Sequence, residues 1–270
     1  MQARVNHDLE WSNLGLQNMI AALEALEQER PDLTLPKIGL FYDTLSVNNI
    51  GAELNNVDLT DQHNLKYFAK SPVDFWSQIP SRFWAQLDGN PSTFTYSSEA
   101  VSAANSSVFE TTAEVFAFHF GGKRQHLVMM RDWLDRFGRN LPADDAYLWG
   151  SALDGVLRAG DDSPIASVGP GFDDRFVQGR PEVRYRDRQA GKTLAQDLIT
   201  AMKMSGVKQI FIETWNEKHE NTQVCETVEE GRLYIDIIKA LVKIWKETSE
   251  EELETALENM FAELGFEQLQ

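Results

Sequence analysis

The sequence predicts an α/β protein, a (β/α)8 barrel of the TIM type that lacks its first one or two strands and carries an extra C-terminal helix. Short apolar runs alternate with amphipathic helical segments along the 270 residues, as parallel strands and their crossover helices do. Polar and aromatic residues follow the ends of these runs, where barrel enzymes place their chemistry. Six strands are visible, which an open doubly wound sheet would also accept, but no glycine-rich phosphate turn follows any of them.

Each element is predicted from its apolar period and its flanking residues. The expected strands span 36–44, 92–97, 125–133, 146–151, 163–168 and 208–215, and the expected helices span 13–29, 61–87, 108–120, 190–205, 227–246 and 250–264. Ser12 and Pro31 bound the first helix, whose predicted inward face is Leu16, Met19, Ile20, Leu23 and Leu26. Pro72 and Pro80 are expected to interrupt the second helix, and Ser249 with Glu252 predicts a capping box for the last. We expect residues 1–248 to form the partial barrel and 249–270 a helix packed on the same domain.

Composition and charge restrict the partners. The chain has a formal net charge of -17 and a pI near 4.7, so nucleic acid and anionic membrane surfaces would repel it. No stretch approaches the ~18 apolar residues of a membrane span, and the single cysteine, Cys225, leaves no intrachain disulfide. No signal peptide is visible, so the protein is cytoplasmic if Met1 is the true start and secreted or periplasmic if residues precede it. The sequence indicates no oligomeric state.

The segment TWNEKHENT (214–222) follows the sixth predicted strand and carries the leading candidate residues. Glycoside cleavage needs two carboxyl groups, one to move a proton at the departing oxygen and one to assist attack at the sugar carbon. Glu217 and Glu220 are therefore the predicted catalytic pair. The predicted substrate-binding residues beside them are Trp215, as an apolar platform for a sugar ring, with Asn216 and His219 as hydrogen-bonding groups. A solvated acidic loop is the alternative interpretation of the same segment.

A second unusual segment, PGFDDRFVQGRPEVRYRDRQAGKT (170–193), follows the fifth predicted strand. Its Arg and Asp side chains can form an ion-pair lattice that orders a long loop, or they can present Arg to sugar hydroxyls or phosphate. Asp173 and Arg175 are the candidate substrate-binding residues because they come first after the strand. Tyr42, Asp43 and Trp149 complete the predicted substrate-binding set, since they stand at other strand ends, although Asp43 could equally cap the next loop.

The chain carries no sequence motif for metal binding, cofactor binding or acyl transfer. No spacing of His, Cys and Asp resembles a metal site, and no cofactor-binding pattern is present, so we expect neither a metal nor a cofactor. There is no G-x-S-x-G elbow for acyl transfer.

Three segments, PKIGLFYDT, PGFDDRFVQGR and IETWNEKHENTQV, together resemble the glycoside hydrolase family 99-like proteins, most closely the bacterial members classed as a domain of unknown function. The resemblance spans residues 11–245 and implies a (β/α)8 barrel acting on α-linked glycans, as in the endo-α-mannosidases of that group. It implies that Glu217 is a base on the sugar 2-hydroxyl and Glu220 the acid/base at the glycosidic oxygen, with retention through a 1,2-anhydro sugar. Asp43 and Asp173 would contact the substrate.

The sequence departs from the family motif N-E-W-H-E-G-T at two positions. Lys218 replaces the tryptophan, and a lysine turned inward would stabilise Glu217 and Glu220 as carboxylates and hinder Glu220 as an acid. Asn221 replaces the glycine, and asparagine tolerates a positive φ better than most residues do. The chain also begins just ahead of a helix that follows two strands in the family, so we expect a truncated barrel that lacks about 60–80 residues, at ~30 or more per βα unit.

Three hypotheses remain. The first is a glycoside hydrolase that cleaves an α-linked oligosaccharide or polysaccharide with retention. The second is a non-catalytic carbohydrate-binding or polysaccharide-assembly protein on the same barrel, which Lys218 and Asn221 favour. The third is a non-functional fragment.

Overall fold

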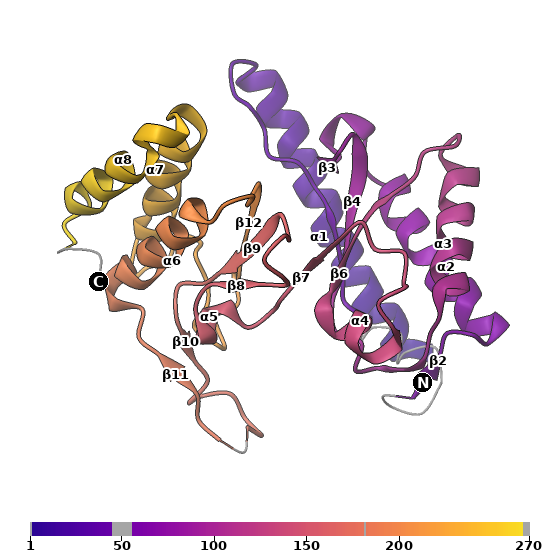
Figure 1. Ribbon diagram of the computed structural model, residues 1–270. Helices are drawn as coiled ribbons and strands as arrows, with labels where there is room; N and C mark the ends of the chain where they lie inside the picture. The colour runs from indigo at the N-terminus through magenta and orange to yellow at the C-terminus, as the bar shows by residue number, and fades with distance from the viewer. Residues whose placement is uncertain (1, 45–55, 181, 267–270) are drawn as a thin grey trace. The chain divides into compact units, whose positions relative to one another are not determined.

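The computed structural model describes residues 2–44, 56–180 and 182–266, and it divides into two compact units (Figure 1). Unit 1 is Met1–Asp144 and unit 2 is Asp145–Gln270. Both contain parallel strands with helices packed on them, so the predicted α/β fold class is confirmed. The strands of the described residues do not close into a barrel.

Unit 1 is built on three parallel strands in the order β1 (Leu40–Tyr42), β4 (Asn90–Thr95) and β6 (His126–Met130). β3 (Gln86–Leu87) pairs antiparallel with β4, and β2 (Val57–Asp58) pairs in parallel with β5 (Val101–Ala103). The helical elements are α1 (Gln2–Glu29), α2 (Gln62–Ser77), η2 (Ser81–Phe83), α3 (Ser106–His119) and α4 (Arg131–Phe137). α2 and α3 pack against each other. Their side chains Phe68, Trp76, Phe109 and Phe116 are buried in one hydrophobic core together with Trp133 of α4.

The helices of unit 1 correct three predictions. α1 begins at Gln2, so Ser12 lies within the helix and does not cap it. Leu23 is buried, and Leu16 and Ile20 pack on the core, while Met19 and Leu26 stand on the flank of this stripe and are exposed. Pro72 does not interrupt α2, because the proline is buried among the core side chains and this packing offsets the hydrogen bond that it cannot donate.

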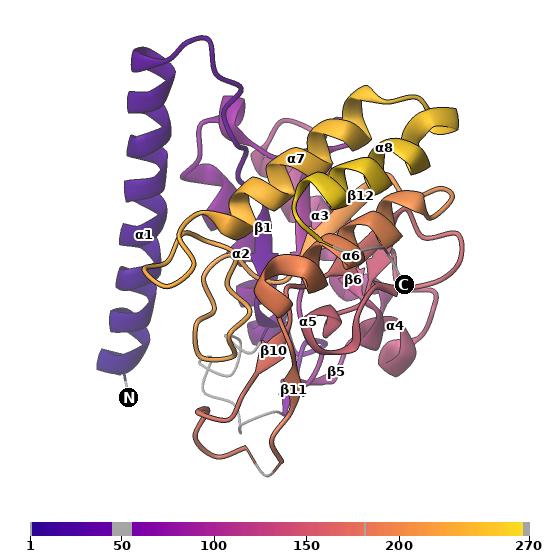
Figure 2. The ribbon, with the colours of Figure 1, turned by 90° about the vertical axis from the view of Figure 1, so that its left-hand side faces the viewer.

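Unit 2 is built on the parallel pair β9 (Ile165–Val168) and β12 (Gln209–Ile212). β8 (Leu157–Arg158) lies antiparallel beside β9, and β10 (Phe172–Asp173) forms a hairpin with β11 (Tyr185–Arg186). The remaining elements are β7 (Asp145–Tyr147), α5 (Ser151–Asp154), η3 (Gln189–Gly191), α6 (Lys192–Lys203), α7 (Leu233–Glu247) and α8 (Glu250–Glu263). Figure 2 shows α6, α7 and α8 gathered together, and α6 packs on both β9 and α7.

The sequence pattern predicts where the helices lie more accurately than where the strands end. The apolar residues of α6 (Leu194, Leu198, Ile199 and Met202) are all buried, as the helical period of this segment predicts. The strands predicted over 125–133 and 146–151 stop earlier, because the short helices α4 and α5 take over. The capping box of α8 does not form: Ser249 Oγ donates to the Glu252 carboxylate at 3.4 Å and caps no backbone N–H. Among the described residues, no helix is both long and apolar enough to cross a membrane.

Gly169, directly after β9, allows a close approach that a side chain would prevent. A Cβ at this position would lie 2.3 Å from Ala152 Cα in α5. We therefore expect Gly169→Ala to destabilise unit 2 by about 1–3 kcal/mol, the usual cost of overpacking, in urea unfolding of the full chain.

The matched control is Gly15→Ala in α1, where a Cβ would meet nothing within 4 Å. It should leave stability unchanged or raise it by about 0.5–1 kcal/mol, because alanine favours a helix interior. Equal stability of the two variants would contradict the packing of α5 on the end of β9.

Candidate active site

Two loops leave the same edge of the unit 2 sheet. β9 and β12 pair with Ile212 opposite Val168, and the Glu213 N–H donates to the Val168 carbonyl at 2.9 Å. The two strands therefore end at one level, and the segments that follow them start side by side. Further along, the Asp173 N–H donates to the Glu220 carbonyl at 2.9 Å and joins the two segments again. This edge is the one where parallel α/β folds place their sites.

Residues 214–223 form a closed loop, called here the 214–223 loop. The Thr214 N–H donates to the Thr222 carbonyl at 3.0 Å, and the hydroxyl oxygens of these two threonines lie 2.9 Å apart. The Thr222 N–H donates to the Glu217 carbonyl at 3.1 Å, and Thr222 itself is buried. Asn221 has a φ of 54°, so this position needs the left-handed conformation that asparagine tolerates. The backbone of the loop is thus held by its own hydrogen bonds.

Both predicted catalytic glutamates lie on this loop and are partly buried. Glu217 Oε1 accepts from the His219 N–H at 3.0 Å, and the Glu217 N–H donates to Thr214 Oγ1 at 3.2 Å. The Glu220 carboxylate instead forms an ion pair with Arg180. The loop backbone holds one glutamate and a guanidinium holds the other, so their surroundings differ.

The side chains around the glutamates are open to a ligand. Trp215 is 60% exposed, and Asn216 and His219 are also exposed. Lys218 is exposed as well and forms no ion pair with any described residue. The cation beside Glu220 is therefore Arg180, and the inward lysine considered from the sequence does not occur.

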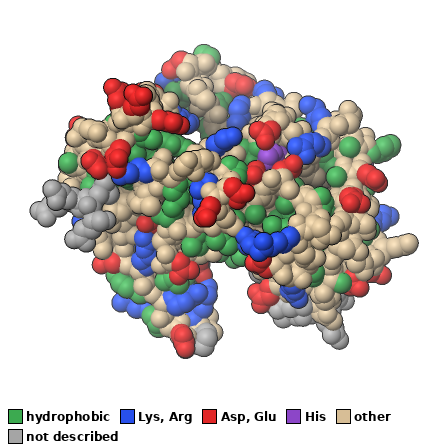
Figure 3. Space-filling view, viewed as in Figure 1, with side chains coloured by type: hydrophobic (Ala, Val, Ile, Leu, Met, Phe, Trp, Pro, Cys, Tyr) green, Lys and Arg blue, Asp and Glu red, His purple; other side chains and the backbone are tan. Residues whose placement is uncertain are grey.

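Ion pairs order the segment 170–193, as one of its two sequence interpretations predicts. Arg175 Nε lies 2.9 Å from Asp173 Oδ1 and Arg175 Nη2 lies 2.6 Å from Asp173 Oδ2, and this contact lowers the pKa of Asp173. The buried Asp174 accepts from the Arg184 backbone N–H at 2.7 Å and from its Nε at 3.1 Å, and these bonds lower the pKa of Asp174. Figure 3 shows basic and acidic side chains interleaved around β10 and β11. Asp173 and Arg175 as substrate contacts stay predictions.

A carboxylate not predicted from the sequence, Glu213, directly precedes the 214–223 loop. It is 2% exposed and accepts from the Gly150 N–H at 3.0 Å and the Ser151 N–H at 3.3 Å. Burial raises the pKa of Glu213, while the backbone N–H groups oppose that rise. Glu213 thereby holds the start of α5 against the end of β12. The neighbouring Trp149 lies against Phe211 of β12, with ring centroids 5.9 Å apart. An acidic residue ending an apolar strand, IFIE, was the available sequence signal.

Tyr42 and Asp43, the other predicted substrate contacts, belong to unit 1. The Tyr42 ring is buried against Phe68, with centroids 5.4 Å apart, and burial raises the pKa of its hydroxyl. Asp43 follows β1 and is exposed. Their contact with substrate stays a prediction. Within the described part of the chain, no group of three or more His, Cys, Asp or Glu side chains could hold a metal ion.

A family model described as a domain of unknown function, DUF5010, matches residues 5–257. The matched range includes the 214–223 loop and the segment 170–193. No curated protein matches the chain.

Solved structures give a likeness in fold. A glycoside hydrolase-like protein matches with a TM-score of 0.54 at 16% identity, over 79% of this chain and 73% of its own. The GH99 endo-alpha-mannosidase from Bacteroides thetaiotaomicron matches with a TM-score of 0.47 at 17% identity, over 78% of this chain and 69% of its own. The resemblance predicted from the three sequence segments is confirmed, and it extends to the fold but not to the roles of residues.

The raised pKa of Glu213 predicts a pH-dependent effect of Glu213→Gln. Between the ordinary pKa of a glutamate and the raised value, the folded protein binds a proton that the unfolded chain has lost, so the wild type loses stability as pH rises. The variant has no such proton. The wild type should therefore exceed the variant in unfolding free energy by more at pH 4.5 than at pH 7.5. The two differences should themselves differ by about 1.4 kcal/mol for each unit by which the pKa of Glu213 is raised.

Thr214→Ser is the matched control, because it alters the adjacent residue without removing a titrating group. Its difference from the wild type should be the same at both pH values. A pH-independent difference for Glu213→Gln would show that burial does not perturb this carboxyl group.

Proposed function

The chain belongs to the family of the domain of unknown function DUF5010, and we propose that it is a glycoside hydrolase that cleaves an α-linked glycan with retention. The observation that carries the proposal is the 214–223 loop, which presents two glutamates in different surroundings beside the exposed Trp215 at the end of a parallel strand. The likeness in fold to a glycoside hydrolase-like protein supports it. On this proposal residues 1–248 form one partial (β/α) barrel domain, with 249–270 as a C-terminal helix packed on it.

In the proposed reaction Glu217 is the base and Glu220 the acid/base. Glu217 accepts the proton of the sugar 2-hydroxyl while that oxygen bonds to the anomeric carbon, and Glu220 gives a proton to the departing glycosidic oxygen. Water then attacks the anomeric carbon of the 1,2-anhydro sugar, with Glu220 accepting the proton of water and Glu217 returning its proton to the 2-oxygen. Two inversions at one carbon give net retention.

The remaining predicted residues bind the glycan in this proposal. The apolar face of a sugar ring would stack on Trp215, and the groups that hydrogen-bond or flank it are Asp173, Arg175, Asn216, His219, Trp149, Tyr42 and Asp43. Trp215 has the strongest support among them, because it is exposed and lies on the same loop as both glutamates.

A non-catalytic carbohydrate-binding protein is the second candidate, and one contact favours it. Arg180 occupies the carboxylate of Glu220, the group that an acid would have to present to the departing oxygen. Such a protein would keep the sugar platform of Trp215 and lose the proton transfer.

Turnover of α-linked oligosaccharides and aryl α-glycosides by the full chain tests the first function. We expect hydrolysis of at least one glycan with retained configuration, followed by NMR, and a loss in kcat of about 10²- to 10⁴-fold in Glu217→Gln and in Glu220→Gln, because each removes a proton-transfer group. Glu226→Gln, an exposed position beyond the loop, is the control with matched chemistry and should keep its activity.

Absence of turnover across a broad panel of α-glycans would refute the enzymatic proposal. Glycan binding that persists in both glutamate variants without hydrolysis would select the carbohydrate-binding protein.

A further inference from the structure

Arg188 is a buried cation that the proposed chemistry does not use. It lies between β11 and η3 and is 7% exposed. Its position is confined by Gly171, where a Cβ would lie 2.8 Å from Arg188 Cγ. A guanidinium removed from water is costly unless its donors are satisfied, so its partners indicate what it does.

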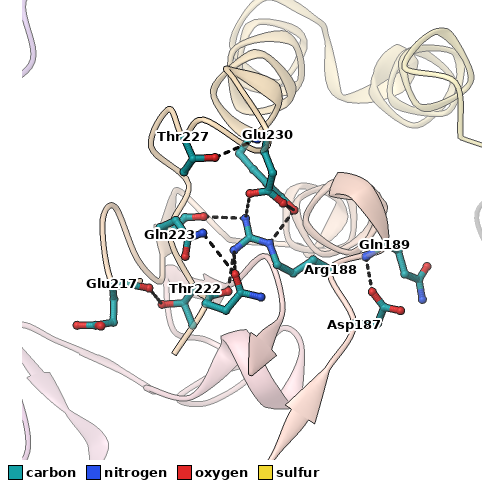
Figure 4. Close-up of polar contacts among 10 residues, drawn as sticks. Asp187, Arg188, Gln189, Glu217, Thr222, Gln223, Thr227 and Glu230 are labelled. Atoms are coloured by element: carbon teal, nitrogen blue, oxygen red, sulfur yellow. Dashed lines mark hydrogen bonds and ion pairs between the residues drawn. The ribbon is translucent and has the colours of Figure 1, made fainter. Parts of the chain in front are cut away.

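Every N–H group of the Arg188 guanidinium has an acceptor (Figure 4). Nε donates to the Tyr234 hydroxyl at 2.7 Å. Nη1 donates to the Asn221 carbonyl at 2.7 Å and to its Oδ1 at 3.4 Å. Nη2 donates to the Gln223 carbonyl at 2.8 Å and to Glu230 Oε2 at 3.1 Å. The five acceptors match the five N–H groups of a planar guanidinium, whereas a lysine has three donors on a single nitrogen atom.

The partners belong to two different elements. Tyr234 lies in α7 and Glu230 precedes it, and the Tyr234 hydroxyl also donates to Glu230 Oε1 at 3.1 Å. The guanidinium carbon stands 4.1 Å from the Tyr234 ring centroid, which adds a cation–π contact. The other acceptors come from Asn221 and Gln223, on either side of Thr222. Arg188 therefore ties the C-terminal half of the 214–223 loop to the start of α7.

From these contacts we infer that Arg188 is a positioning residue that fixes the 214–223 loop and, through it, Glu217 and Glu220. Thr222 lies between Asn221 and Gln223, whose carbonyls Arg188 binds. The Thr222 N–H donates to the Glu217 carbonyl, so fixing Thr222 also fixes the backbone of Glu217. Figure 4 shows the Glu217 carboxylate pointing away from Arg188, so the arginine acts on the backbone and not on the carboxylate. The effect on catalysis rests on the proposed function, whereas the effect on the loop does not.

These contacts explain why an asparagine suits position 221. Its Oδ1 accepts from Arg188 and, at 3.3 Å, from Gln223 Nε2, while its backbone keeps a φ of 54°. A glycine would allow the same turn but would leave one guanidinium N–H without its acceptor. The asparagine therefore joins the loop to the Arg188 cluster.

Hydrogen exchange of the full chain, without any sugar, tests the inference. In Arg188→Lys we expect amides of residues 214–225 to exchange about 10- to 100-fold faster than in the wild type, as the loss of hydrogen bonds to a charged group predicts. Amides of β9 and of the middle of α7 should keep their wild-type rates. The matched control is Arg186→Lys, which breaks a comparably placed pair with Asp197 and touches no residue of the loop. Unchanged exchange of 214–225 in Arg188→Lys would overturn the inference.

A milder variant covers the case in which Arg188→Lys does not fold. Tyr234→Phe removes one acceptor and keeps the ring, so exchange of the loop should rise by a smaller factor, and no rise at all would also overturn the inference. If a glycan is turned over, Arg188→Lys should lower kcat at least tenfold and change KM by a smaller factor, because Arg188 binds the half of the loop that carries Glu220 and not the half that carries Trp215. Faster loop exchange without any glycan turnover would uphold the positioning role and refute only the proposed function.

Discussion

The parallel pairing of β9 with β12 is the constraint on which the candidate site depends. It sets Ile212 opposite Val168, so that the chain leaves both strands at one edge. The Asp173 N–H bond to the Glu220 carbonyl then joins the two outgoing segments, and Arg188 fixes the second of them to α7. Most of these contacts involve backbone N–H or carbonyl groups, and they hold the shape of the loop from within the protein. Such preorganisation favours binding and catalysis alike.

Two buried carboxylates of unit 2, Asp174 and Glu213, are stabilised in different ways. Asp174 has Arg184 as a partner, which supplies both a backbone and a side-chain donor, and its pKa is lowered. Glu213 has no described cation in contact and relies on the N–H groups of Gly150 and Ser151, and burial raises its pKa. The first arrangement orders a long charged segment, and the second joins the start of α5 to the end of β12.

The elements that span several turns or strand positions could be predicted from the sequence, since their apolar periods repeat. α3, α6, β4 and β9 lie where the pattern places them, and Glu217 and Glu220 share one loop as expected. Two-residue strands such as β2 and β8 have no period to detect. Arg188 stands among other arginines in the sequence, and its acceptors lie 33–46 residues away, so nothing local distinguishes it. Its burial becomes visible only when the chain is folded.

A crystal structure of the Glu220→Gln variant of the full chain with an α-linked oligosaccharide tests the central claim most directly, because the variant should bind the glycan without cleaving it. The account predicts a sugar ring on the Trp215 indole, with its 2-hydroxyl within about 2.6–3.2 Å of the Glu217 carboxylate. It also predicts that the bonds from Arg188 to Asn221 and Gln223 persist in the complex. A glycan bound away from the 214–223 loop, with Trp215 and Glu217 uncovered, would contradict it.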